Sequence, residues 1–233
     1  MQIELNENLV HIHAHVCGDG NMYMKKEKRS PSAIKNSRMT EPFYRHVIEY
    51  TNYCPELLDK MTLAIKSLFP KTYVYRDNKK RRIQARNKPL YCMLKMLKYI
   101  DGSNWDIPQE IVENERFRKI WLRAIFDDEG SVYKSCIVCY NTNKKAVLTI
   151  QKMLALEGIR TTLYNRLPTK LKYKICYTIR IPSESFLEFK KIGFDHSIKK
   201  KKYEDYCKEK MHRPGCVQEG VVPFTFESPR QNP

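Results

Sequence analysis

The chain has 233 residues, of which 43 are Lys or Arg and 26 are Asp or Glu, so its formal net charge is +17. With 42% apolar residues it can bury a core, and no apolar run approaches the ~20 residues of a membrane helix. This composition excludes a disordered chain and predicts no membrane partner. The basic balance indicates a polyanionic partner, above all nucleic acid.

Eight cysteines raise the question of disulfide bonds and metal ligands. Residues 1–8 are acidic and lack the layout of a signal peptide, so we expect an intracellular protein, cytoplasmic or in an organellar matrix, with reduced thiols. Cys136 and Cys139 form a lone Cys-x-x-Cys, but residues three apart on a strand point to opposite faces and chelate poorly. His11 and His15 lie one helical turn apart and are an alternative metal pair, so a His/Cys metalloprotein stays open as a distant hypothesis.

The first half of the chain begins with an apolar, helix-like run, residues 12–20, that ends in an acidic residue and a glycine. Apolar periodicity and turn residues predict the elements that follow. In chain order these are a strand over 21–28, a loop over 30–42, a strand over 43–51, an amphipathic helix over 55–69, a hairpin over 71–87 that turns at Asp77 and Asn78, and a helix over 89–100 that ends near Gly102.

The second half repeats this order after a short, turn-rich junction over 102–108. The motif recurs at residues 122–130, 110 positions after its first copy. The predicted elements after it are a strand over 131–140, a helix over 144–157, a hairpin over 160–181 that turns at Pro168 and Thr169, and helices over 184–192 and 197–210. The remaining residues have no clear periodicity and predict an irregular tail.

The two hairpins carry the prediction of a binding surface. In both, basic and polar side chains alternate with apolar ones, so one sheet face is suited to a core and the other is basic. Such a face presents hydrogen-bond donors to phosphates and base edges. The residues for which we predict DNA contact are Tyr23, Lys25, Arg45, Arg76, Lys80, Arg82, Gln84, Arg86, Lys134, Arg166, Lys170, Lys172, Lys174 and Arg180.

The two motifs predict that the halves pair through their first helices. The third and seventh positions of each motif share a helix face, and three of these four residues are small: Ala14, Gly18 and Ala124, with Asp128 as the fourth. Small residues let two helices approach closely. Pairing would bring Asp19 and Glu129 side by side, and two carboxylates beside a basic surface are suited to metal-assisted cleavage of a phosphodiester.

Two such motifs, each followed by a strand, a helix and a basic hairpin, resemble the LAGLIDADG homing endonucleases over roughly residues 5–210. Residues 107–108 and 121–132 are similar to the family's second motif and its approach. Residues 192–199 are similar to a late family segment that ends in lysine.

The resemblance implies an α+β fold of two pseudo-symmetric αββαββα subdomains, here residues 1–105 and 106–211, packed through the motif helices, with an irregular tail over 212–233. Two four-stranded sheets would form a saddle over double-stranded DNA. Two motifs in one chain imply a monomer. The implied activity is site-specific cleavage of both strands across the minor groove, leaving short 3′ overhangs.

The resemblance also assigns roles to residues that match the family's motifs. It implies that Mg²⁺, for which Mn²⁺ can substitute, is bound by the acids with help from the preceding backbone carbonyls. A lysine would lie near the attacking water or leaving oxygen, and two polar residues would orient water. These residues are Asp19 and Glu129 as acids, Gly18 and Asp128 as carbonyl ligands, Lys199 as the basic group, and Asn52 and Asn141 as the polar pair.

The chain departs from the family pattern in several places. His13 and His15 replace apolar residues of the first motif, Glu129 replaces Asp, and Asp128 is larger than the usual small residue. Lys199 has no matching residue in the first half, which predicts slower cutting of one strand. The alternative function is a non-cleaving member of the same fold, an intron RNA-splicing maturase or a DNA-binding regulator. The retained acids argue against it, because a binding module need not keep two repelling carboxylates at a helix seam.

Overall fold

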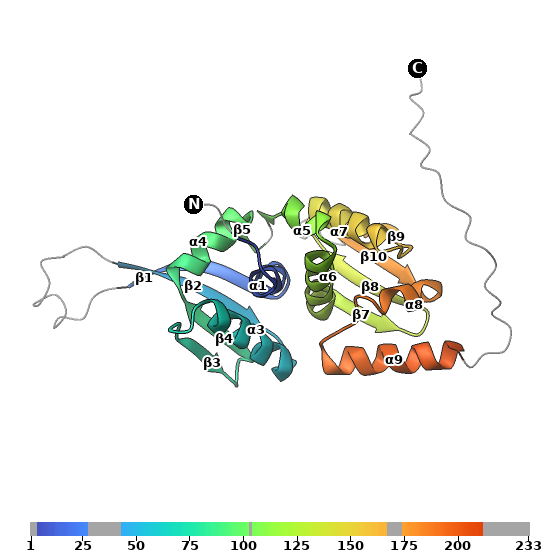
Figure 1. The fold of residues 1–233 in the computed structure, drawn as a ribbon, viewed down its shortest axis with the longest axis horizontal. Coiled ribbons are helices and arrows are strands. Elements are labelled where there is room, and N and C mark those ends of the chain that lie inside the picture. Colours follow the sequence, from blue (N-terminus) through green and yellow to red (C-terminus); the bar gives the residue numbers. More distant parts are fainter. Residues whose placement is uncertain (1–3, 28–42, 103, 167–173, 212–233) are drawn as a thin grey trace, which may run out of the picture.

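The fold of the chain is described from a computed structural model over residues 4–27, 43–102, 104–166 and 174–211. Figure 1 shows two halves that lie side by side, each a sheet with helices packed against it, and helices α1 and α6 adjacent at the centre. The predicted loop over 30–42, the turn at Pro168 and Thr169 and the tail over 212–233 lie outside the described residues.

The first half contains one four-stranded antiparallel sheet, in the order β1-β2-β4-β3. Helix α3 packs on α1 and β4, and α4 packs on β2. The elements are α1 (Glu7–Cys17), β1 (Gly20–Glu27), β2 (Phe43–Thr51), α3 (Pro55–Leu68), β3 (Val74–Asp77), β4 (Arg82–Arg86) and α4 (Lys88–Met96).

The second half repeats this topology in a sheet of order β7-β8-β10-β9. Its elements are α5 (Gln109–Glu113), α6 (Glu115–Glu129), β7 (Gly130–Tyr133), β8 (Cys136–Asn141), α7 (Lys144–Leu156), β9 (Thr162–Arg166), β10 (Cys176–Pro182), the 3-10 turn η1 (Ser183–Ser185), α8 (Phe186–Phe189) and α9 (Ser197–Met211). The identical strand orders bear out the predicted repeat of one plan in both halves.

Four of the helices begin at an asparagine. The side-chain oxygens of Asn6, Asn87, Asn114 and Asn143 each accept a hydrogen bond from the backbone N–H three residues later, at 2.8–3.2 Å. Such caps satisfy amides that a helix leaves unpaired at its first turn. The two motif helices are therefore started in the same way, by Asn6 for α1 and Asn114 for α6.

Strand register sorts the side chains of each sheet onto two faces. In the first sheet Met22 pairs with Ile48, which pairs with Ala85, and all three are buried beneath the helices. In the second sheet Ile137 pairs with Ile181, and both are fully buried. The alternate residues of every strand therefore form an outer face on each sheet.

The elements differ from the sequence prediction in several places. The strand predicted over 131–140 is a hairpin, because Lys134 and Ser135 form a turn between β7 and β8. The helix predicted over 184–192 is reduced to η1 and the single turn of α8. The helix predicted over 89–100 ends at Met96, and a small sheet of β5 (Tyr99–Asp101) and β6 (Asn104–Trp105) follows it. Within the described ranges, no helix is both long and apolar enough to cross a membrane.

Candidate active site and nucleic-acid interface

The two motif acids lie where α1 and α6 end. Helix α1 ends at Cys17, and Gly18 and Asp19 lead into β1, whereas α6 extends through Glu129 and β7 begins at the next residue. The two helices pack against each other. The backbone N of Asp19 lies 3.5 Å from Oδ2 of Asp128, the residue before Glu129, so the ends of the two motif helices meet at one seam.

Asp128 directs its side chain across this seam into the first half. Its Oδ1 accepts hydrogen bonds from the Tyr50 hydroxyl at 2.7 Å and from Asn52 Nδ2 at 3.2 Å. Its Oδ2 lies 2.9 Å from His15 Nδ1 and 3.5 Å from the backbone N of Asp19. The carboxyl group is fully buried. The sequence prediction considered only the backbone carbonyl of this residue.

Gly18 makes room for this carboxyl group. A Cβ atom at position 18 would lie 2.5 Å from Asp128 Oδ2 and 2.8 Å from its Cβ, closer than any side chain could stand. Gly18 and Asp128 are the corresponding residues of the two motifs. The small residue in the first motif and the larger one in the second are therefore complementary.

Burial gives the acids of the seam raised pKa values. Burial, with the nearby Asp128 carboxyl, raises the pKa of Asp19 to about 6, and the Lys199 ammonium opposes this shift. Burial and the charges of Asp19 and Asp128 raise the pKa of Glu129 to about 7. Burial also raises the pKa of Asp128 and lowers that of His15.

Lys199 lies at the C-terminal end of α6. Its Nζ donates hydrogen bonds to the carbonyl oxygens of Phe126 at 3.3 Å, of Asp128 at 3.2 Å, and of Asp127. A cation is favourable there because the last carbonyls of a helix lack partners and carry the negative end of its dipole. Burial lowers the pKa of Lys199, and the nearby carboxylates oppose this shift.

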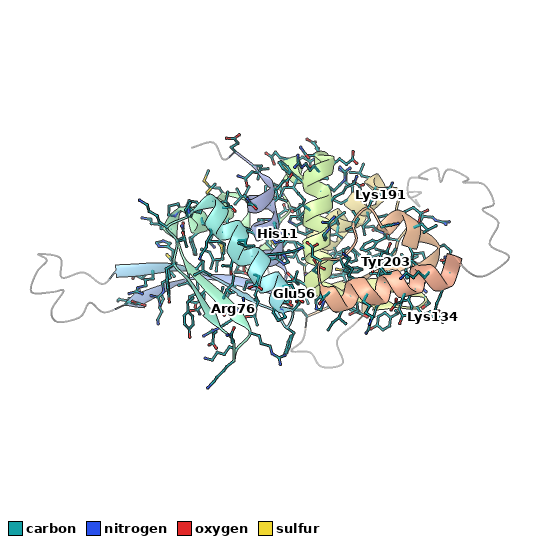
Figure 2. The ribbon with its side chains drawn as sticks, turned by 60° about the horizontal axis from the view of Figure 1, so that its bottom comes forward. His11, Glu56, Arg76, Lys134, Lys191 and Tyr203 are labelled. Atoms are coloured by element: carbon teal, nitrogen blue, oxygen red, sulfur yellow. The ribbon has the colours of Figure 1, made fainter. Side chains whose placement is uncertain are left out.

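Asp127 anchors the segment that delivers Lys199. The buried Asp127 carboxylate accepts hydrogen bonds from the backbone N–H groups of Asp195 and His196, at 3.0 and 2.9 Å, just before α9 begins. The starts of α3 and α9 meet beside the seam, where Glu56 lies in Figure 2. Asp127 thus contacts the segment before α9, whereas Asp128 contacts the first half of the chain.

Asn52 and Asn141 occupy equivalent turns, as their matching sequence positions predict. Asn52 Oδ1 accepts from the backbone N of Cys54 at 2.9 Å, and Asn141 Oδ1 accepts from the backbone N of Asn143 at 2.9 Å. Asn52 Nδ2 also donates to Asp19 Oδ2 at 3.1 Å. The structure therefore places Asn52 against a motif acid.

The donor set at the seam fits a hard divalent cation. Mg²⁺ is bound by one or two carboxylates and completes its shell with water and phosphate oxygens. Asp19 and Glu129 supply two carboxylates whose pKa values are raised by burial and neighbouring acids, and a cation would relieve both effects. No group of three His, Cys, Asp or Glu side chains among the described residues could hold a metal ion alone, which leaves the metalloprotein hypothesis without a site there.

The outer face of the first sheet carries charged and hydrogen-bonding side chains around Glu49. This carboxylate accepts hydrogen bonds from Arg82 at 3.0 Å, from the Tyr23 hydroxyl at 3.4 Å, and from Gln84. The predicted contact residues that strand register places on this face are Tyr23, Lys25, Arg45, Arg82, Gln84 and Arg86.

Two predicted contacts of the first half lie elsewhere. Arg76 pairs in register with the buried Ile83, so it belongs to the helix side of the sheet, and its guanidinium forms an ion pair with Asp59 of α3 (Figure 2). The sequence analysis assigned this strand no register, and the DNA contact of Arg76 stays a prediction. Lys80 lies in the turn before β4 and not on the strand face.

The outer face of the second sheet carries exposed tyrosines. Tyr133, Tyr140 and Tyr164 are 49, 39 and 51% exposed, and register places Thr178 and Arg180 on the same face. Lys174 is exposed just before β10, and Lys134, in the β7–β8 turn, pairs with Glu209 of α9 at 2.5 Å. Lys170 and Lys172 lie outside the described residues, as does the side chain of Arg166.

Sequence reasoning missed Tyr50 and the roles of the buried histidines. Tyr50 lies two residues after Ile48, on the same buried face of β2, so its position predicts a core residue. Its hydroxyl nevertheless donates a hydrogen bond to Asp128. A polar tip on a buried aromatic residue is the one signal that pointed to a partner. The Asp128 side chain was marked only as larger than expected.

Comparison with known proteins agrees with the geometry of the seam. Residues 116–193 match the model of the LAGLIDADG-like domain. Among solved structures, mesophilic variants of the homing endonuclease I-DmoI superpose with a TM-score of 0.56 at 16% identity, covering 80% of this chain and 94% of that one. The fold is that of the LAGLIDADG homing endonucleases.

Other structures with this fold extend the comparison. I-DmoI in complex with DNA and Ca gives a TM-score of 0.55 at 17% identity over 78% of this chain and 86% of that one. I-SmaMI, a LAGLIDADG homing endonuclease bound to cleaved DNA, gives 0.51 at 9% identity over 88% of both chains. Full-length DUF199/WhiA from Thermatoga maritima gives 0.51 at 12% identity over 95% of this chain and 65% of that one. No curated protein sequence matches the chain.

Proposed function

We propose that the chain is a site-specific DNA endonuclease that cuts both strands of a long duplex site, leaves short 3′ overhangs, and acts as a monomer. One observation carries the proposal. Two acids, Asp19 and Glu129, end the paired motif helices of a LAGLIDADG fold and have pKa values raised by burial and mutual proximity. Sites that combine burial with like charges are typical of catalysis.

Mg²⁺ is the cation we assign to this site, with Mn²⁺ as a substitute. Asp19 and Glu129 would hold it, with backbone carbonyl help from Gly18; the Asp128 carbonyl already accepts from Lys199. When bound, the ion supplies activation of water and neutralisation of charge on the scissile phosphate. Structures of I-DmoI with DNA and Ca and with DNA and Mn support a divalent ion in this fold.

The protein's own groups would position the reactants. Asn52 donates to Asp19 and can orient a water molecule beside it, and Asn141 occupies the equivalent turn in the second half. Lys199 can place its ammonium near the scissile phosphate. The outer sheet faces would track the duplex, with a net charge of +17 favouring encounter with the phosphate backbone.

A cleavage selection tests this proposal. Purified protein is incubated with a randomised double-stranded DNA library and Mg²⁺, with Ca²⁺ as the control, and the cut ends are sequenced. A single long, weakly palindromic motif among Mg²⁺-dependent ends is the expected result. Asp19→Asn and Glu129→Gln should abolish cutting and leave binding largely intact. Full activity of either variant would contradict the proposal, and selective DNA or intron RNA binding without cutting would favour a regulator or a maturase.

A further inference from the structure

Among the described residues, the Asp128 carboxyl group makes its hydrogen bonds to the first half of the chain. His15 comes from α1, Tyr50 from β2, and Asn52 from the turn after β2, whereas Asp128 itself belongs to α6. The group is fully buried, so these contacts are shielded from competition with water. The Asp128 side chain is therefore connected to Asp19, the acid of the first motif, although Asp128 lies next to Glu129 in the second.

Asn52 links Asp128 to the catalytic acid. Its Nδ2 has two hydrogens and donates one to Asp19 Oδ2 at 3.1 Å and one to Asp128 Oδ1 at 3.2 Å. Its Oδ1 is fixed by the backbone N of Cys54. Because all three hydrogen bonds are made together, the carboxyl group of Asp128 fixes the plane of the amide that contacts Asp19.

Within the described part of the second half, no asparagine side chain donates to Glu129 as Asn52 does to Asp19. The residue that corresponds to Asp128 is Gly18, and a side chain there would collide with Asp128 itself. Asn141 repeats the turn of Asn52, but no side chain from position 18 can reach it. The charged groups that act on Glu129 are Asp19, Asp128 and Lys199. Lys199 acts on both acids, whereas the Asn52 amide donates to Asp19.

We propose that Asp128 is a positioning residue that holds the Asn52 amide on Asp19, so that cleavage of one DNA strand, and not of the other, depends on the Asp128 side chain. This inference rests on the proposed function. The asymmetry follows from packing, since only one of two corresponding positions at a tight helix crossing can carry a side chain. Tyr50 and His15 also contact the Asp128 carboxyl group and help to hold it in place.

Strand-resolved kinetics test the inference. The duplex recovered from the library selection is labelled with a different fluorophore on each strand, and single-turnover rates are measured with Mg²⁺. Asp128→Ala should slow one strand about tenfold or more and leave the other within about twofold, since misplacing one catalytic group costs rate without weakening DNA binding. Asn52→Ala should slow the same strand. Asp128→Ala should add little in the Asn52→Ala background, because both changes remove one link.

Conservative variants separate positioning from a general loss of stability. Asp128→Asn keeps an oxygen that accepts from Tyr50 and Asn52 and should restore most of the slowed rate. Tyr50→Phe removes one hydroxyl and should slow the same strand more mildly. Tyr203→Phe is the matched control, since its buried hydroxyl donates to Phe186 O away from the seam and should leave both strands unchanged.

A measurement on the protein without metal or DNA adds a second readout. The side-chain amide NMR signal of Asn52 should shift in Asp128→Ala and stay in place in Tyr203→Phe. Equal slowing of both strands by Asp128→Ala, or an unchanged Asn52 signal, would overturn the inference while the endonuclease stands. If the wild-type protein cuts no duplex at all, the proposed function fails, and the strand dependence fails with it.

Discussion

Gly18 and Asp128 occupy corresponding positions in the two motifs, and their sizes are coupled. A methyl group at Gly18 would lie 2.5 Å from Asp128 Oδ2 and 2.8 Å from Asp128 Cβ. Overpacking of this kind costs about 1–3 kcal/mol, so Gly18→Ala should lower the free energy of unfolding by that amount. Urea denaturation of the metal-free protein measures the change.

The double variant Gly18→Ala/Asp128→Gly is the control for this prediction. It moves the side chain from one helix to the other and should recover most of the stability that Gly18→Ala loses, beyond what the two single changes predict by addition. Strict additivity would show that Asp128 is not the group with which the new methyl collides.

The motif acids should make the stability of the metal-free protein fall as pH rises. The pKa of Glu129 is about 7 in the folded chain and near 4.5 in the unfolded chain. Between these two pH values the folded state therefore binds more protons than the unfolded state. The free energy of unfolding then decreases as pH rises through this window and is fully restored below it. Glu129→Gln removes the charge, so this variant should be more stable than wild type at pH 8 and not at pH 4.

Thermal melts in EDTA at the two pH values measure this difference. Comparing variant with wild type at each pH cancels the opposite contribution of the buried histidines, whose lowered pKa values reduce stability in acid. Mg²⁺ should stabilise the wild type more at pH 8 than at pH 5, because the carboxylates must lose their protons to bind it. A gap between variant and wild type that does not change with pH would contradict this account.

A buried histidine, His13, connects helices α1 and α6 at the seam. His13 Nδ1 accepts from Trp121 Nε1 at 3.0 Å, and His13 Nε2 donates to Leu97 O at 2.9 Å, which joins both motif helices to the end of α4. Burial lowers the pKa of His13 to about 4, so the imidazole stays neutral and keeps one donor and one acceptor.

Replacing this histidine with an apolar residue should weaken the seam even though the family pattern has an apolar residue there. His13→Leu leaves the Trp121 N–H and the Leu97 carbonyl buried without partners, at a cost of about 2 kcal/mol or more in the free energy of unfolding. His11→Leu on the same helix is the matched control, because His11 Nε2 is buried without a hydrogen-bond partner in the described part of the chain. Denaturation curves that rank His11→Leu as the more damaging change would refute this assignment.

Features that depend on local sequence patterns could be predicted, whereas contacts between distant residues could not. Local periodicity predicted most strands and helices of both halves, and the family resemblance of the two motifs implied the two four-stranded sheets and the packing of the motif helices. The turn at Lys134 and Ser135 was missed because the strand pattern continues through it. Contacts such as Asp128 with Tyr50 join residues 78 positions apart, so no local pattern reports them. Register, which places Arg76 on the helix side, likewise depends on pairing between strands.

The two sheets have the same topology, but their outer faces carry different side chains. The first presents a hydrogen-bonded group around Glu49, with Arg82 and Gln84 held in place. The second presents exposed tyrosines. Arginine and glutamine read purine edges through paired hydrogen bonds, whereas aromatic surfaces make mostly apolar contacts. The two halves of a DNA target should therefore be read by different kinds of contact.

The two faces of the first sheet offer a direct test of which side meets DNA. Arg86 is exposed on the outer face, and Arg76 pairs with Asp59 on the helix side. If the outer face tracks the duplex, Arg86→Ala should weaken DNA binding and reduce the slope of log affinity against log salt by about 1, the value for one lost phosphate contact. Arg76→Ala removes the same charge from the opposite face and should change neither quantity. Titrations with Ca²⁺ at several salt concentrations measure both, and equal effects of the two variants would mean that net charge alone, not this face, attracts the DNA.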